Sequence, residues 1–511
     1  MAGEVQQVEK LVEEPVQLGI VTRDPLTWTK WMKLGITLNI CANAFLNNAC
    51  AAGLVPTLNA VSAELGVAIT TASYLMSYNV LAQGLSNLIW VPTTLCYGKR
   101  WVVVLSMAML LPCLAWAAVA TSFESLLGAR VVGGFASGAS EAFAPMMIAD
   151  IWYEHDLTTA LGFFALCTFA GATLGQTALG FVTERLGWRW AYWVVLIACG
   201  LNMFTMLIWL PETTFQRGLT VGITAGDVQR NEELREKHTI TNPETALPSV
   251  DADAEVQVNR AEPMESMRPN LWFIRHPEID YHANWLSYFV APFYFVMLPT
   301  VLWSTLTYAA TAAAFTALGT CIAQLLGAPP YNFSPGDQGL FSLSSFIGIG
   351  LGGTLGSRSV DIVNARINRR RSEQGKIHKP EERLIMLALP FFTATVGLVL
   401  YGVAVQRQLP WIAAAFGYGI HSFGFVVLAG TTFSYAIDSY LVRSGEVMVF
   451  NNTVRALLSF GVTHVVPTWL TTAGPTVVYS VLAAIIWGFL LLGIPVIIFG
   501  PKLRELTNHF L

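Results

Sequence analysis

Two charged residues of opposite sign lie inside an apolar stretch, residues 124–151, that is long enough to cross a bilayer. Arg130 and Glu141 are about three helical turns apart and share one face, whereas Asp150 lies on the opposite face. A charge at bilayer depth costs about 2.5–3.5 kcal/mol, so it normally faces protein or a water-filled path. We therefore expect Glu141 to bind and release protons, with Arg130 setting the local field. The alternative is a buried helix whose charges pair with other helices for assembly alone.

Side-chain amides recur every four residues in the first two apolar stretches. They are Asn39, Asn43 and Asn47 in the first, and Asn79, Gln83 and Asn87 in the second. A four-residue step drifts only about 40°, so each set forms one stripe along a helix. Such a stripe either bonds neighbouring helices or lines a cavity. Both interpretations stay open, and we expect Asn43 and Asn47 to contact a substrate.

The second half of the chain also carries polar groups in apolar stretches. Arg455 needs a carboxylate, a carbonyl or an anionic ligand, and Asn451 and Asn452 are spaced to brace it. Asp438 or a helix end is the alternative partner. An imidazole exchanges protons near neutral pH, which favours a role for His421. The residues expected to contact a substrate in this half are Tyr308, Tyr418, His421, Asn452 and Arg455.

The composition is that of a membrane protein. Of 511 residues, 54% are hydrophobic and only 12% are charged, about half the charge of a soluble domain. Seven cysteines without ordered spacing indicate neither a disulfide framework nor a metal site. No nucleophile–base pair or phosphate loop is recognisable, so we expect no enzyme, no cofactor and no nucleic-acid partner. The first thirty residues lack an apolar core, and no cleavable signal peptide is expected.

Apolar runs of spanning length recur twelve times, which predicts an all-α membrane protein. They cover residues 33–55, 69–93, 101–122, 124–151, 159–183, 190–210, 298–326, 338–362, 384–405, 409–437, 446–470 and 475–499. The long polar linker between the sixth and seventh runs indicates two six-helix halves. Residues 285–299 either lie along the membrane interface or begin the seventh span. The expected division is a tail at 1–32, bundles at 33–212 and 286–499, a linker at 213–285 and a tail at 500–511.

The basic residues predict the orientation. With the N-terminus in the cytosol, 24 of the 29 Lys and Arg residues fall in cytosolic segments, as the positive-inside rule requires. We expect a multi-pass protein of the plasma membrane with both termini cytosolic, in contact with the lipid bilayer as a monomer. Asn332, followed by Ser334, forms a glycosylation sequon in a predicted outer loop, although Pro335 comes directly after it.

Several motifs together resemble a known family. They are Arg130 with Gly134 and Asp150, Pro92 with Tyr97-Gly98-Lys99-Arg100, Gly187-Trp188-Arg189-Trp190, Leu210-Pro211-Glu212-Thr213, the segment from Lys379 to Leu384, and Asp438 with Gly445-Glu446 and Asn451-Asn452. Over residues 33–500 the chain resembles the major facilitator superfamily, in the fungal branch of the twelve-helix drug:proton antiporters. The resemblance implies two pseudo-symmetric halves rocking about a site lined by spans one, four, seven and ten. It also implies gating residues at Gly98, Lys99, Arg100, Asp150, Asp438 and Glu446.

The sequence departs from that family at two places. Leu95 stands where the loop after span two usually has an acid, so a gate must use Lys99 and Arg100 reaching Asp150 or Glu154. Gly175-Gln176 stands where the antiporter signature reads Gly-Pro, which leaves the direction of export open.

Three functional hypotheses follow. The first is proton-coupled efflux of a small organic molecule such as a drug, toxin or secondary metabolite. The second is proton-driven import of a cationic nutrient such as a polyamine, with Glu141 as its counter-charge. The third is a non-transporting sensor, which the short C-terminal tail of about a dozen residues disfavours.

Overall fold

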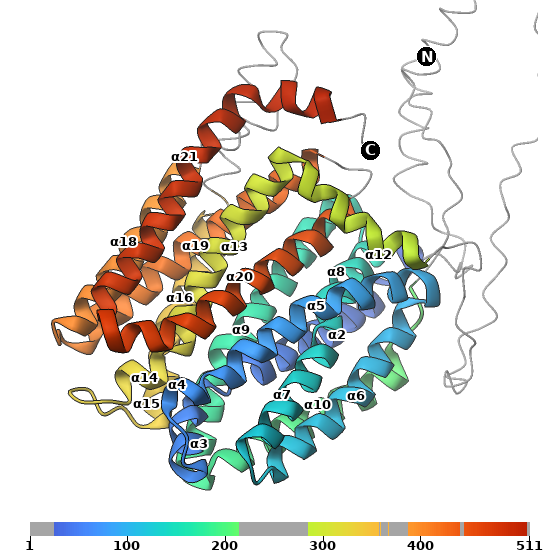
Figure 1. The fold of residues 1–511 in the computed structure, drawn as a ribbon. Helices are drawn as coiled ribbons and strands as arrows, with labels where there is room; N and C mark the ends of the chain where they lie inside the picture. Colours follow the sequence, from blue (N-terminus) through green and yellow to red (C-terminus); the bar gives the residue numbers. More distant parts are fainter. Residues whose placement is uncertain are drawn as a thin grey trace, which may run out of the picture.

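The computed structural model describes residues 25–213, 285–356, 387–439 and 444–507, with the single positions 358 and 366. Every regular element in these residues is a helix (Figure 1). Residues 214–284 of the predicted linker, most of the basic loop before span nine, residues 1–24 of the N-terminal tail and residues 508–511 of the C-terminal tail lie outside the described residues.

The long helices fall into two groups. The N half consists of α2 (Lys30–Ala52), α5 (Tyr74–Tyr97), α6 (Lys99–Val119), α7 (Phe123–Ser137), α8 (Ala139–Ile151), α9 (Glu154–Leu186) and α10 (Trp188–Trp209). The C half consists of α13 (Pro299–Thr320), α15 (Pro335–Phe341), α16 (Leu343–Leu351), the π-helix η5 (Gly352–Gly356), α18 (Ala388–Gln406), α19 (Trp411–Ser439), α20 (Ser444–Ala473) and α21 (Pro475–Thr507). Short elements connect them: η1 (Pro25–Thr27), η2 (Val55–Thr57), α3 (Leu58–Leu65), α4 (Ile69–Ala72), α12 (Trp285–Tyr294), η4 (Phe295–Met297) and α14 (Ile322–Leu326).

The predicted all-α membrane fold is confirmed. Among the described residues, ten helical segments are long and apolar enough to cross a bilayer. Two more helices, α5 with 24 residues and α20 with 30, have the length but not the apolarity of the ten. They complete the twelve predicted spans. These two polar helices pack against each other and join the two halves.

Two local features differ from uninterrupted spans. The fourth span breaks at Gly138, where a Cβ would lie 2.3 Å from the Gln83 carbonyl oxygen and 2.0 Å from the Ser86 hydroxyl. Only glycine allows α7 and α8 this close to α5. The stretch before the seventh span is a separate helix, α12, whose Trp285 indole donates to Thr93 of α5 at 3.3 Å. Because α12 also packs on α20, it crosses from one half to the other.

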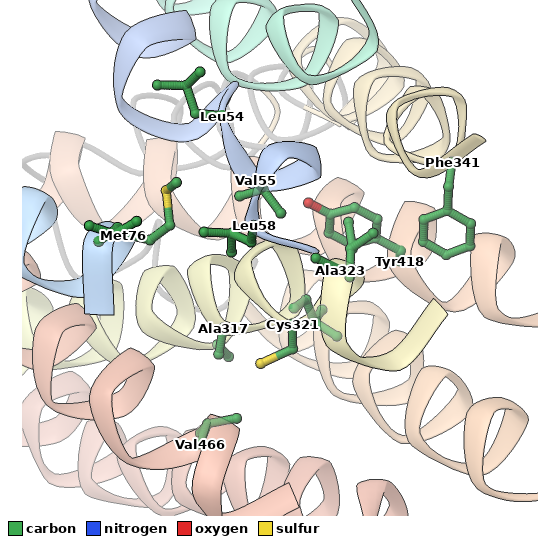
Figure 2. Packing of buried hydrophobic residues seen from close by; sticks show 14 of the residues in the cluster. Leu54, Val55, Leu58, Met76, Ala317, Cys321, Ala323, Phe341, Tyr418 and Val466 are labelled. Atoms are coloured by element: carbon green, nitrogen blue, oxygen red, sulfur yellow. The ribbon is translucent and has the colours of Figure 1, made fainter. Parts of the chain in front are cut away.

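The halves meet closely at the end of the bundle where α3 and α14 lie, here called the α3/α14 end (Figure 1). Asn59 of α3 donates to the Ala323 carbonyl of α14 at 3.0 Å, and Glu184 of α9 accepts from the Gly336 amide of α15 at 3.1 Å. A buried apolar cluster with residues from both halves fills this end (Figure 2). Its labelled members are Leu54, Val55, Leu58 and Met76 of the N half with Ala317, Cys321, Ala323, Phe341, Tyr418 and Val466 of the C half.

Candidate functional site

An ion pair joins the two halves in the middle of the spans. Arg455 of α20 donates from Nη2 to Glu141 of α8, at 2.7 Å to Oε2 and 2.9 Å to Oε1. Gln83 of α5 donates to the same carboxylate at 3.3 Å. The side chains of Arg455 and Glu141 are 23% and 14% exposed, so the pair is not fully shielded from solvent. A charge-assisted contact of this kind is about twice as strong as a neutral hydrogen bond.

A tyrosine of the C half completes this group. Tyr308 of α13 lies close enough to Arg455 and Glu141 to interact electrostatically with both. Its ring stacks on Phe425 of α19, with centroids 6.5 Å apart, and Phe425 meets Phe169 of α9 edge to face at 5.8 Å. We call Gln83, Glu141, Tyr308 and Arg455 the central site. It draws side chains from both halves and has aromatic rings from both beside it.

The local structure explains how the two charges are held. Glu141 lies in the first turn of α8, where the helix dipole favours a carboxylate. Asn451 does not brace Arg455 as predicted, because its side chain accepts from Thr305 of α13. The partner of Arg455 is therefore the Glu141 carboxylate. The side chain of Asp438, the alternative partner, lies outside the described residues.

Arg130 has a different environment. It is only 3% exposed and donates to the Cys50 and Ala51 carbonyls at 2.7 and 2.8 Å, and to the Leu75 carbonyl at 3.4 Å. Cys50 and Ala51 are among the last residues of α2, whose carbonyls have no partner within their helix. Arg130 thus ties α7 to the end of α2 and to α5. It lies about 16 Å along the span from Glu141, which none of its described bonds reaches.

The first amide stripe binds two helices together. Asn43 and Asn47 are buried and bonded to each other, and Asn43 also donates to Asn202 of α10 at 3.2 Å. Asn202 in turn donates to Asn39 at 3.0 Å. These bonds place the amides predicted to contact substrate in the contact between α2 and α10. In the second stripe, Asn79 of α5 donates to the Arg130 carbonyl at 2.8 Å, and only Gln83 joins the central site.

Two other predicted contacts lie within the C half. His421 is fully buried, and its Nδ1 lies 2.8 Å from the Ala394 carbonyl of α18. Tyr418 is buried between Phe315 and Phe341, with ring centroids 6.0 and 6.1 Å away. Asn452 differs from both, because its backbone faces Gly84 of α5 where the two halves meet.

The predicted gating residues of the N half are brought together at the opposite end from α3 and α14. The Lys99 ammonium pairs with Asp150, as the sequence predicted. Glu212 accepts from the Lys99 and Arg100 amides at 3.1 Å each and so caps the start of α6. Gly98 has a φ of 88°, a conformation that favours glycine. The sequence identified Glu212 only within the motif Leu210-Pro211-Glu212-Thr213, and its contact with the start of α6 was not predicted.

The other predicted positions are less informative. Glu446 lies in the first turn of α20, and the side chain of Glu154 lies outside the described residues. Asn332 is exposed in the loop between α14 and α15, where a glycan could be attached.

Comparison with known proteins gives concordant matches. The family profile described as Major Facilitator Superfamily matches residues 40–463. An uncharacterized MFS-type transporter of Schizosaccharomyces pombe is 23% identical, covering 95% of this chain and 86% of its own length. Efflux pump vrtL of Penicillium aethiopicum is 23% identical, covering 95% of this chain and 89% of its own length.

Solved structures share the fold. A POT family transporter in complex with 5-aminolevulinic acid superposes with a TM-score of 0.60 at 11% identity, covering 91% of this chain and 96% of its own. The xylose transporter XylE from E. coli superposes with a TM-score of 0.55 at 11% identity, covering 90% and 98%.

Proposed function

Because the chain belongs to the Major Facilitator Superfamily and is a multi-pass membrane transporter, we propose that it exports a small organic molecule in exchange for protons that bind Glu141. The efflux direction is supported by relatives such as efflux pump vrtL and efflux pump FUB11 of Gibberella moniliformis, which is 24% identical over 84% of this chain and 66% of its own length. The exported class would be a toxin, drug or secondary metabolite, moved across a plasma membrane by a monomer with both termini in the cytosol.

The observation that carries the proposal is the Glu141–Arg455 pair between the halves. Ionised Glu141 attracts the guanidinium across the interface and holds the halves together. A proton on Glu141 removes the charge, and with it most of the attraction. Proton binding and bridge formation therefore exclude each other. An empty carrier without a proton stays bridged, which prevents it from returning without its counter-ion.

Exchange requires that proton and substrate compete. A substrate that donates a hydrogen bond or carries positive charge would compete with Arg455 for the Glu141 carboxylate, as a proton does. Tyr308 and Gln83 would bind its polar atoms, and Phe425 and Phe169 its apolar part. Import of a cationic nutrient would use the same carboxylate, and among the described residues no contact separates import from export, so the efflux direction rests on the relatives.

The tight contacts at the α3/α14 end support a state that faces the cytosol, since the basic residues place that end outside. In this state the substrate enters from the end that carries Lys99 and Asp150. We propose that this pair lies at the cytosolic gate, with Gly98, Arg100, Asp438 and Glu446.

The test is export from a drug-sensitive fungal strain and from proteoliposomes, using a panel of antifungal toxins. The wild type should lower the accumulation of at least one compound, and an inward proton gradient should accelerate its export. Glu141→Gln should abolish that acceleration. The matched control is Glu124→Gln, which removes an exposed carboxylate from the same span. Export by Glu141→Gln that still follows the gradient would eliminate the proton role, and a folded wild type that exports no compound of the panel would count against efflux.

A further inference from the structure

A second titratable side chain lies between the halves, closer to the α3/α14 end than the central site. His464 of α20 stacks face to face on Tyr74 of α5, with ring centroids 4.4 Å apart and an interplanar angle of 16°. Tyr78 of α5 meets the same imidazole edge to face at 5.9 Å, and Phe460 lies 5.5 Å from it. The central site does not use these four rings, which we call the seam cluster.

The seam cluster lies on the same pair of helices as the central site. His464 is nine residues beyond Arg455 along α20, about 13 Å toward the α3/α14 end. Tyr74 and Tyr78 precede Gln83 on α5 in the same direction. Both sets of side chains therefore respond to the same relative movement of α5 and α20.

The described contacts of the imidazole are with aromatic rings. Its Nδ1 is buried and has no hydrogen-bond partner among the described residues, so hydrogen bonding at that atom favours neither protonation state. The ring lies over the face of Tyr74, which carries the negative part of an aromatic quadrupole. A cation placed over such a face is attracted to it, whereas a neutral imidazole gains only stacking.

The charged and titratable groups around the seam cluster are few. On α20 the next charge is Arg455, which Glu141 neutralises, and on α5 the nearby titratable groups are the two tyrosines, because Cys96 and Tyr97 lie at the other end of that helix. Of the other helices packed on α20, α13 carries Tyr308 of the central site, and α19 carries His421, which is bonded to the Ala394 carbonyl. Arg130 of α7 reaches the Leu75 carbonyl of α5, and its charge is shared among backbone carbonyls. Gln324 of α14, which donates to the Pro467 carbonyl at 3.0 Å, is neutral. Among these residue types, histidine is the one that ordinarily gains a charge near neutral pH.

We propose that His464 is a second proton-binding group, and that its protonated form clamps the two halves together at the α3/α14 end through Tyr74 and Tyr78. Protonation of His464 has the opposite effect on the contact between the halves to protonation of Glu141. A proton on Glu141 removes a bridge between the halves, whereas a proton on His464 strengthens one. With that end facing outside, an acidic exterior favours closure of the outer end after the exchanged proton has bound.

The experiment measures closure of the α3/α14 end without any substrate. Spin labels are attached at Ala68→Cys and Thr472→Cys, two exposed positions on opposite halves, and the distance distribution is recorded in nanodiscs from pH 8 to pH 5. All proteins carry Glu141→Gln and Arg455→Met, so that the central site neither titrates nor leaves an uncompensated charge on α20. Protein without the two added cysteines gives the background from native thiols. We expect the ratio of closed to open molecules to rise about three- to thirtyfold on acidification.

The matched control is His464→Phe, which keeps a ring on Tyr74 but carries no charge at any pH. It should hold the closed fraction constant across the pH range, and Tyr74→Leu should reduce the pH response. If His464→Phe does not fold, His464→Gln replaces it as a neutral side chain. An unchanged closed fraction with His464 intact, or an equal pH response in the His464 variants, would overturn the proposal. Because the assay contains neither substrate nor Glu141, its result is independent of whether the protein exports anything.

Discussion

Two arginines lie in apolar spans of this protein, and their partners differ. Arg130 donates to the Cys50 and Ala51 carbonyls, which belong to its own half. Arg455 donates to the Glu141 carboxylate, which belongs to the other half. A carbonyl cannot gain a proton at any physiological pH, but a carboxylate can. The first contact is therefore permanent, and the second can be broken by the ion that the transporter is proposed to exchange.

The same division extends to neighbouring contacts. Within the N half, Asn43 bonds Asn202, and amide pairs of this kind do not titrate. Between the halves lie Glu141 and His464, whose charges can change. Contacts inside a half should therefore determine stability, whereas contacts between halves should determine which state is populated. The predictions below test that separation.

The largest expected loss of stability is caused by substitution of Arg130. Arg130→Met leaves the last carbonyls of α2 buried without a partner, because it removes the two short hydrogen bonds that the guanidinium donates to them, and it also loses the 3.4 Å contact to the Leu75 carbonyl. At about 1.5–3 kcal/mol for each, the free energy of unfolding should fall by roughly 3–6 kcal/mol. Thermal unfolding in detergent, followed by tryptophan fluorescence, measures the loss. Arg130→Lys should rescue little, because one ammonium cannot reproduce the planar fork that reaches both carbonyls.

Arg455→Met is the comparison for that measurement. Its side chain lies between the halves, so the variant should unfold within a few degrees of the wild type while the export assay loses its dependence on the proton gradient. Equal losses of stability at Arg130 and Arg455 would contradict the distinction between permanent and switchable contacts.

The fold was predictable because the bilayer imposes it. Apolar runs of spanning length identified every long helix, including α5 and α20, the two most polar. The break at Gly138 was not predicted, because it depends on the close approach of α5 to that glycine. The position of α12 across the two halves also depends on a distant contact, that of Trp285 with Thr93.

The sequence predicted individual residues of the candidate site, but it did not predict which of them contact one another. Helical periodicity placed Glu141 and Arg455 in their spans and indicated that each needs a partner. It could not pair them, because they are 314 residues apart and meet only when the halves dock. The local spacing of Asn451 and Arg455 predicted a brace within α20, but the Thr305 hydroxyl of a neighbouring helix competes for that amide. Local spacing predicts which residues share a face, and tertiary packing decides what that face meets.

A smaller change in free energy is expected from a substitution at the contact between α5 and α20. A Cβ at Gly84 would lie 1.8 Å from the Ala456 Cβ, so Gly84→Ala must push the two helices apart. Overpacking of this kind costs about 1–3 kcal/mol, and here the cost falls on the state in which the helices touch. The spin-label distances of the α3/α14 end should lengthen. Gly461→Ala is the control, because a Cβ there meets nothing within 4 Å and should only stabilise α20, by about 0.5–1 kcal/mol.

The smallest effect is expected at Glu212, whose contacts lie within the N half. Glu212→Gln keeps the shape of the side chain but removes the negative charge from the first turn of α6, where it accepts from the Lys99 and Arg100 amides. Loss of a charged cap costs about 0.5–2 kcal/mol. Hydrogen exchange at these two amides should accelerate, while the distances between the halves stay as in the wild type. A change in those distances would mean that this end of the N half also controls the state, and that contacts inside a half are not only structural.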